Sequence, residues 1–164
     1  TYGVSLPDGD IPRCDKLFGP GNAYVAEAKR YASSLPGGPS ADMPAGPSEL
    51  MVVVDRDAAP EIAAADLLSQ AEHDADAQVI LVSTSRANLD YILTEVERQV
   101  ATLPRETIAR ASLNETRAIL VRDEDTACDV INLYGPEHLA LQVEEPEAML
   151  PSIRAAGAIF VGRF

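Results

Sequence analysis

The chain has 164 residues, of which 46% are hydrophobic and 24% charged, and these values are ordinary for a soluble globular domain. Its 26 acidic and 13 basic residues give a net charge of −13, which disfavours binding to nucleic-acid phosphates and to anionic membrane surfaces. No apolar run approaches the ~20 residues that a membrane-spanning helix requires.

The N-terminal part of the chain is rich in proline and glycine. Residues 16–18 favour a short strand and residues 23–33 a helix, and the turn Gly19-Pro20-Gly21-Asn22 joins them. Free backbone N–H groups at the start of a helix favour an anion, and glycine lets a ligand approach closely. The proline and glycine residues between 35 and 47 predict loops and a domain boundary near residue 47.

The remaining residues alternate between two patterns. Five short apolar runs are rich in Val and Ile and mostly do not alternate with polar residues, as in strands that are covered on both faces. These runs are residues 50–54, 79–82, 118–121, 139–143 and 158–161. Amphipathic helical patterns separate them, at residues 60–72, 89–103, 124–134 and 145–155. We therefore predict an α/β fold with a mostly parallel sheet and flanking helices.

His73 and His138 are the only histidines of the chain, so any imidazole chemistry depends on them. Gln70 and His73 are three residues apart near the end of the helix predicted at 60–72, on one helical face. This spacing can present an amide oxygen and an imidazole to one metal ion, but a zinc site needs three or four ligands. A polar helix C-terminus explains the same residues without a metal.

Glu137 and His138 form a second candidate pair, directly before the strand predicted at 139–143. A carboxylate and an imidazole with different pKa values suit proton transfer near neutral pH, although a Gly-Pro turn with a charged tip is a simpler interpretation. Ser48 precedes the first strand of the sheet without a G-x-S-x-G frame, which argues against a hydrolase nucleophile.

These candidates share one position relative to the strands. Ser48, His73 and Glu137-His138 all precede strands, so in a parallel sheet their loops lie at the same N-terminal edge and can form one site. Ligands more often bind at the carboxyl edge of such sheets. The placement makes sense if another domain or subunit packs on the N-terminal edge and completes the pocket.

Five motifs in these segments resemble histidinol dehydrogenase. They are Phe-Gly-Pro-Gly-Asn-Ala-Tyr (18–24), Glu-Ala-Lys-Arg (27–30), Asp-Met-Pro-Ala-Gly-Pro-Ser-Glu (42–49), Asp-Leu-Leu-Ser-Gln-Ala-Glu-His (66–73) and Tyr-Gly-Pro-Glu-His-Leu (134–139). The resemblance implies a homodimer that oxidises L-histidinol to L-histidine in histidine biosynthesis. The oxidation passes through an aldehyde, with two hydride transfers to NAD and a Zn²⁺ ion that positions the substrate.

The resemblance also implies roles for individual residues. Gln70 and His73 are expected to bind zinc and to border the substrate, together with Ser48. His138 is expected to act as base toward the substrate hydroxyl, and Glu137 toward the water that adds to the aldehyde. Asn22 is expected to contact NAD.

The family chain is much longer, and its remaining zinc ligands, an Asp and a His, lie beyond residue 164. We therefore expect a central fragment that is inactive alone. Residues 1–48 would belong to one Rossmann-like domain, and residues 49–164 would form most of another. The absence of an initiator Met and the strand-like residues 158–161 near the end agree with this expectation.

Two alternatives remain open at this stage. A metal-dependent hydrolase could use His73 with Glu137 and His138, but it lacks a third histidine ligand. A non-catalytic α/β binding or scaffold module could use the same loops as an interface. Cys14 and Cys128 have no C-x-x-C partner, which favours reduced thiols in the cytoplasm over a disulfide scaffold.

Overall fold

The protein is described by a computed structural model, which places residues 14–19, 21, 23–42 and 48–163. The chain divides into two compact units, Thr1–Gly46 and Pro47–Phe164. No helix among the described residues is long and apolar enough to cross a membrane.

The described residues of the first unit form one helix and a small parallel sheet. Strand β1 (Lys16–Leu17) pairs with β2 (Ser40–Ala41), and α1 (Ala23–Ser34) lies between them in the sequence. The helix and the first strand are where the sequence predicts them. Strand β2 lies in a segment predicted as loop, because a two-residue bridge is too short to leave an apolar pattern.

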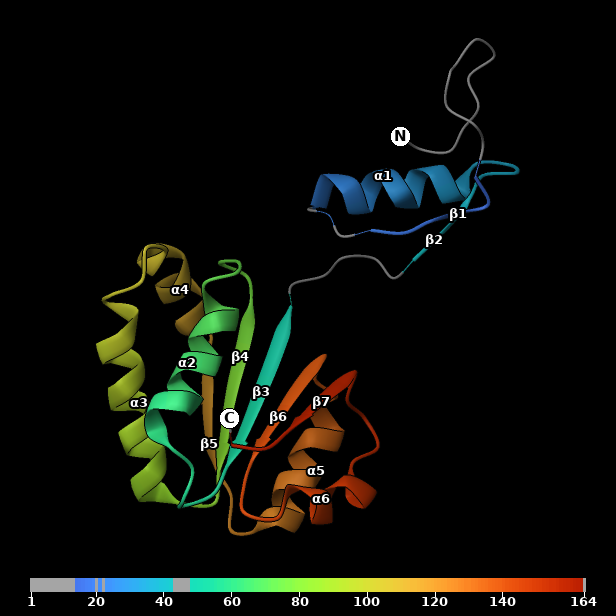
Figure 1. The fold of residues 1–164 in the computed structure, drawn as a ribbon. Coiled ribbons are helices and arrows are strands. Elements are labelled where there is room, and N and C mark those ends of the chain that lie inside the picture. Colours follow the sequence, from blue (N-terminus) through green and yellow to red (C-terminus); the bar gives the residue numbers. More distant parts are fainter. Residues whose placement is uncertain (1–13, 20, 22, 43–47, 164) are drawn as a thin grey trace. The chain divides into compact units, whose positions relative to one another are not determined.

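The second unit is built on a five-stranded parallel sheet with the order β5-β4-β3-β6-β7 (Figure 1). Its strands are β3 (Glu49–Val54), β4 (Gln78–Ser83), β5 (Arg117–Leu120), β6 (His138–Gln142) and β7 (Ala158–Val161). Each of the five predicted strands is present within one residue at either end. The chain starts at the central strand β3, builds outward to β5 and then returns to β6 on the other side, which is the doubly wound arrangement.

Helices cover both faces of this sheet (Figure 1). On one face, α2 (Pro60–Ala71), α3 (Arg86–Val100) and α4 (Glu106–Leu113) enclose a core with Val52, Val54 and Leu81 of the strands. On the other face, α5 (Glu124–Tyr134) and the short α6 (Pro146–Met149) pack with Met51 and Val53. Alternate residues of β3 thus enter opposite cores, which explains its continuous apolar sequence.

Local signals set the helix ends. Ser85 accepts a hydrogen bond from the N–H of Asn88 at the start of α3, and Asp123 accepts one from Thr126 at the start of α5. Gly135 ends α5 in a left-handed conformation, with a φ of 68°.

Three helical segments differ from the sequence prediction. The segment predicted as a helix at 145–155 forms only α6 and a 3₁₀ turn at Leu150–Ser152. The α-helix does not continue because Pro151 has no backbone N–H to donate. Gly157 therefore does not end a helix, although the sequence had suggested that it would. Helix α3 ends at Val100, and Leu103 continues the apolar stripe from a turn. Helix α4 was not predicted, because its eight residues are too few for a clear period.

Candidate active site

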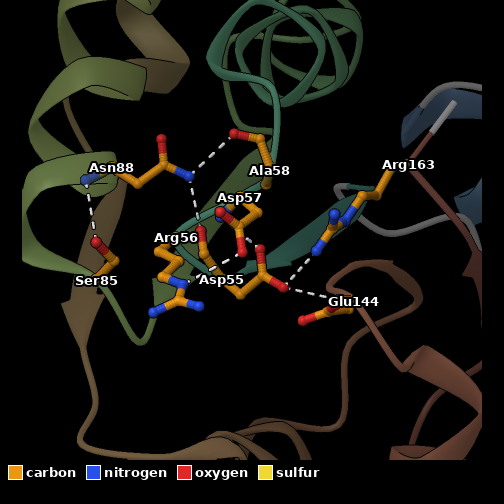
Figure 2. A network of polar contacts seen from close by, with 8 residues as sticks. All are labelled: Asp55, Arg56, Asp57, Ala58, Ser85, Asn88, Glu144 and Arg163. Atoms are coloured by element: carbon orange, nitrogen blue, oxygen red, sulfur yellow. Dashed lines mark hydrogen bonds and ion pairs between the residues drawn. The ribbon is translucent and has the colours of Figure 1, made fainter.

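The carboxyl edge of the sheet, where doubly wound domains usually bind ligands, carries a polar network (Figure 2). Asp55 follows β3, and its Oδ2 accepts hydrogen bonds from the N–H of Glu144 at 2.6 Å and from Nη2 of Arg163 at 2.5 Å. The buried amide of Asn88 donates to the carbonyl oxygens of Asp55 and Ala58, at 2.7 and 3.1 Å. These contacts join the loops after β3, β6 and β7 to the start of α3.

The adjoining crevice is unsuited to a phosphate group. It has a volume of about 350 Å³ and is lined by Asp55, Arg56, Asp57, Thr84, Ser85, Glu124 and Glu144. The lining has four carboxylates, and even with Arg56 and the Arg163 guanidinium paired to Asp55 the carboxylates are in excess, so the pyrophosphate of a dinucleotide would be repelled. The usual ligand site of the fold is therefore a poor cofactor site in this unit.

The N-terminal edge brings together residues that are far apart in the sequence. The N–H of Gln78 donates to the carbonyl oxygen of Ser48 at 3.1 Å. The N–H of Glu49 donates to Oε2 of Glu137 at 3.3 Å. Ser48 therefore lies beside the start of β4, and its neighbour in sequence, Glu49, contacts Glu137. One detail differs from the sequence interpretation, because His138 is the first residue of β6 and does not precede the strand.

The contacts of His138 favour one tautomer. Its Nδ1 lies 3.2 Å from the carbonyl oxygen of Glu49 and 3.7 Å from Oε2 of Glu137. Both neighbours are acceptors, so Nδ1 carries the proton in the neutral ring and Nε2 keeps its lone pair. The ring also stacks on Phe160 of β7, with 6.0 Å between the centroids. His138 is therefore oriented on two sides, with a basic nitrogen available.

Gly157 packs directly against the backbone of Glu137. Its N–H donates to the carbonyl oxygen of Pro136 at 3.0 Å, and the N–H of Ala158 donates to that of Glu137 at 2.8 Å. A Cβ added at residue 157 would lie 2.7 Å from the Glu137 carbonyl oxygen, which is closer than carbon and oxygen normally approach. The position therefore accepts only glycine unless Glu137 moves.

A pocket of about 310 Å³ lies beside this edge. It is lined by Leu50, Asp66, Ser69, Gln70, His138, Ala140 and Phe160. The predicted residues Gln70 and His138 thus share one pocket, although 68 positions separate them in the chain, whereas Ser48, His73 and Glu137 are not among its lining residues. Gln70 is half-buried, and its Nε2 is buried without a hydrogen-bond partner.

Asp66, which lines this pocket, contacts Gln142, and the sequence interpretation missed this contact. Nε2 of the buried Gln142 donates to Oδ2 of Asp66 at 2.6 Å. Burial raises the pKa of the Asp66 carboxyl above its usual value, and the hydrogen bond from Gln142 opposes this shift. Asp66 lies one helical turn before Gln70, and this spacing was the sequence signal that could have placed Asp66 near the site. Nothing in the sequence indicated that Gln142 would contact Asp66.

His73 lies just beyond α2, so it does not share a helical face with Gln70 as predicted. A turn joins the two residues instead, in which the N–H of His73 donates to the carbonyl oxygen of Gln70 at 3.1 Å. Nη2 of Arg105 donates to the His73 carbonyl oxygen at 3.1 Å, and the His73 side chain is exposed. Within the placed residues, no three His, Cys, Asp or Glu side chains are grouped to hold a metal ion.

Asn22, the predicted NAD contact, lies outside the described residues. Gly19, three residues earlier, is held by Asp42, whose Oδ2 accepts its N–H at 2.9 Å. Nζ of Lys29 lies 2.6 Å from Oδ1 of Asp42 and also donates to the Gly19 carbonyl oxygen. The Lys29 ammonium, followed by the Gly19 N–H, lowers the pKa of Asp42.

The fold and the pocket define a Rossmann-like α/β protein in which the predicted residues Gln70 and His138 share a pocket beside the N-terminal edge of the sheet. A family model described as histidinol dehydrogenase matches residues 1–164. The chain belongs to the histidinol dehydrogenase family.

Individual relatives agree with this assignment. The chain is 49% identical over 152 residues to a histidinol dehydrogenase of Yersinia pestis, covering 93% of this chain and 34% of the relative. It is 47% identical over 152 residues to that of Escherichia coli K12, covering 93% and 35%. The crystal structure of histidinol dehydrogenase from Elizabethkingia anophelis superposes with a TM-score of 0.90 at 47% identity, covering 94% of this chain and 35% of that one.

The chain therefore spans about a third of the length of these relatives. A gamma-glutamyl phosphate reductase from Thermotoga maritima shares the fold, with a TM-score of 0.54 at 14% identity over 91% of this chain and 41% of that one. Family membership favours the dehydrogenase interpretation over the hydrolase and scaffold alternatives.

Proposed function

We propose that this chain supplies the proton-transfer residues and part of the metal site of a histidinol dehydrogenase. The enzyme would oxidise L-histidinol to L-histidine through the aldehyde, with two hydride transfers to NAD. The observation that carries the proposal is the setting of His138, whose Nδ1 lies 3.2 Å from the Glu49 carbonyl oxygen and which lines one pocket with Gln70. The cytoplasmic location, the homodimer and the two Rossmann-like domains, with residues 1–48 in one and 49–164 in the other, are part of the same proposal.

His138 would act in the alcohol oxidation. The substrate hydroxyl must lose a proton as its carbon loses a hydride, and Nε2 of a neutral imidazole can accept that proton near neutral pH. The Glu49 carbonyl oxygen, 3.2 Å from Nδ1, stabilises the ring as it becomes positively charged. Glu49 would thus set the tautomer through its backbone.

Glu137 would act in the second oxidation. Water must add to the aldehyde and lose a proton before the second hydride leaves, and an exposed carboxylate can take that proton. The N–H of Glu49 and the tight contact with Gly157 would hold Glu137 for this step. Ser48, whose carbonyl oxygen is already bonded to Gln78, would contact the substrate beside it.

Gln70 and His73 fit the zinc ion that the family uses. The imidazole of His73 is exposed, and the half-buried Gln70 has an amide oxygen that can bind a metal ion. Bound zinc would polarise the substrate alcohol or its amine nitrogen. Because a zinc site needs three or four protein ligands, Gln70 and His73 would not suffice, and the resemblance supplies the others as an Asp and a His beyond residue 164. Asn22 would contact NAD, close in sequence to Gly19, which both Lys29 and Asp42 contact.

Zinc binding by the full-length protein tests the metal part of this proposal. We expect chelation to abolish NAD-dependent histidinol oxidation and added Zn²⁺ to restore it. His73→Ala should lower the zinc content after dialysis well below one ion per chain and lower kcat at least ~10²-fold, whereas the control Asp76→Asn, at an exposed neighbour, should change neither. Full zinc retention by His73→Ala would contradict the ligand role.

Replacement of Gly157 tests how the Glu137 segment is held. Gly157→Ala should push the Glu137 carbonyl oxygen away and displace both Glu137 and His138. We expect kcat to fall by about tenfold or more, because small misplacements of catalytic groups are costly, while thermal unfolding shifts by only a few degrees. Steady-state kinetics and melting curves, with Ser152→Ala as an exposed control, measure both effects. An unchanged kcat would show that the contact is not needed.

A further inference from the structure

We propose that Asp66 is the positioning residue of Gln70. Its free carboxylate oxygen would accept a hydrogen bond from Nε2 of Gln70 and thereby turn Oε1 of Gln70 toward the metal ion. This inference rests on the proposed function, because it assumes that Gln70 binds zinc.

The first support is an unpaired donor. Nε2 of Gln70 is buried and has no hydrogen-bond partner. Buried N–H groups are nearly always paired, so an unpaired one needs an explanation. An amide that binds a metal through its oxygen must place its nitrogen somewhere else, and that nitrogen requires an acceptor nearby.

The second support is the position of Asp66. Residues four apart on a helix are neighbours on its surface, so Asp66 and Gln70 can reach one another along α2. Both also line the same pocket, to which His138 contributes from β6. Glu72, Asp74 and Asp76 are close in sequence, but none of them lines this pocket.

The third support is that one oxygen of the Asp66 carboxylate already accepts a hydrogen bond, which fixes the side chain and leaves the other oxygen for Gln70. The amide of Gln142, which is 2% exposed, donates to Oδ2 of Asp66. No ion pair among residues 14–19, 21, 23–42 and 48–163 includes Asp66, so its Oδ1 lacks a cationic partner there.

These contacts would form a directional chain from the sheet to the metal. Gln142 donates to Asp66, Asp66 accepts from Gln70, and Gln70 is left with its carbonyl oxygen facing outward. Groups that orient metal ligands in this way commonly change metal affinity by ~10–100-fold when they are replaced. Asp66 would thus act on the metal without touching it.

Asp66→Asn gives a specific test in the full-length protein. The new amide would accept from Gln142 through its oxygen and present its NH₂ group to Gln70, which would turn the Gln70 oxygen inward and its nitrogen toward the metal. We expect the zinc dissociation constant, measured by competition with a chelator, to rise ~10–100-fold. Asp66→Ala, which removes the acceptor without adding a donor, should give a smaller rise. Asp90→Asn, at an exposed position of α3, should leave it unchanged.

The double variant Asp66→Asn with Gln70→Glu separates positioning from a general structural role. The carboxylate introduced at position 70 has oxygens on both sides, so it can accept from the amide introduced at position 66 and still face the metal. Zinc affinity should therefore recover to within a few-fold of the wild type. Gln70→Glu alone places two carboxylates against each other and should not bind zinc better than the double variant.

Two failures can be told apart. If the wild-type protein binds no zinc, the proposed function loses its metal site. If it binds zinc and both Asp66 variants bind it equally well, or if the double variant shows no recovery, the role of Asp66 is wrong while the proposed function stands. Because Asp66→Ala and the double variant are read separately, a failure of Asp66→Asn to fold does not remove the test.

Discussion

Replacing His138 with Asn is expected to lower kcat for histidinol oxidation by ~10²–10⁴-fold in the full-length protein, with little change in folding. The loss follows from the missing Nε2, which is the only basic ring nitrogen left free by the contact of Nδ1 with Glu49. The Asn side chain can still donate to the Glu49 carbonyl oxygen, so the start of β6 should keep its place beside β3.

Steady-state kinetics with thermal unfolding and zinc analysis check this expectation. The KM for NAD, the zinc content and the melting temperature should stay close to those of the wild type, as they should for the control Asp90→Asn. A kcat within a few-fold of the wild type would exclude His138 as the base.

Replacing Glu137 with Gln is expected to separate the two oxidations. The amide oxygen of the new side chain can still accept the Glu49 N–H, which now lies 3.3 Å from Oε2 of Glu137, but the amide cannot take a proton from water. The alcohol oxidation should therefore continue, and the aldehyde oxidation should slow by ~10²-fold or more. The aldehyde should accumulate, and the yield of NADH should fall from two toward one per histidinol.

Separate assays with the alcohol and with the aldehyde as substrate measure the two steps. An equal loss in both would mean that Glu137 acts mainly by placing His138, whose Nδ1 lies 3.7 Å from the Glu137 carboxylate. That result would contradict a separate role for Glu137 in activating water.

The fold was largely predictable because burial on both faces leaves a strong signal. Strand β3 reads Glu-Leu-Met-Val-Val-Val, and its last five residues are buried in two opposite cores. Because the alternation of strands and helices predicts a parallel sheet, the residues before the strands were expected at one edge. Proximity of Ser48 to the Glu137 segment could therefore be expected without any contact being predicted.

The features of the site that the sequence did not predict depend on contacts between distant segments. The hydrogen bond between Asp66 and Gln142 joins residues 76 positions apart, and the close approach of Gly157 to Glu137 depends on how β7 starts beside β6. No local pattern encodes such contacts. The assignment of zinc, NAD and individual roles came from the family resemblance, because Gln70 and His73 alone are too few for a metal site.

The NADH yield of the full-length protein tests the central claim most directly. With limiting L-histidinol and excess NAD, the account predicts two NADH and one L-histidine per histidinol consumed for the wild type, and a yield near one with accumulation of the aldehyde for Glu137→Gln. A wild-type yield of one, or no NADH at all from zinc-loaded protein, would contradict it.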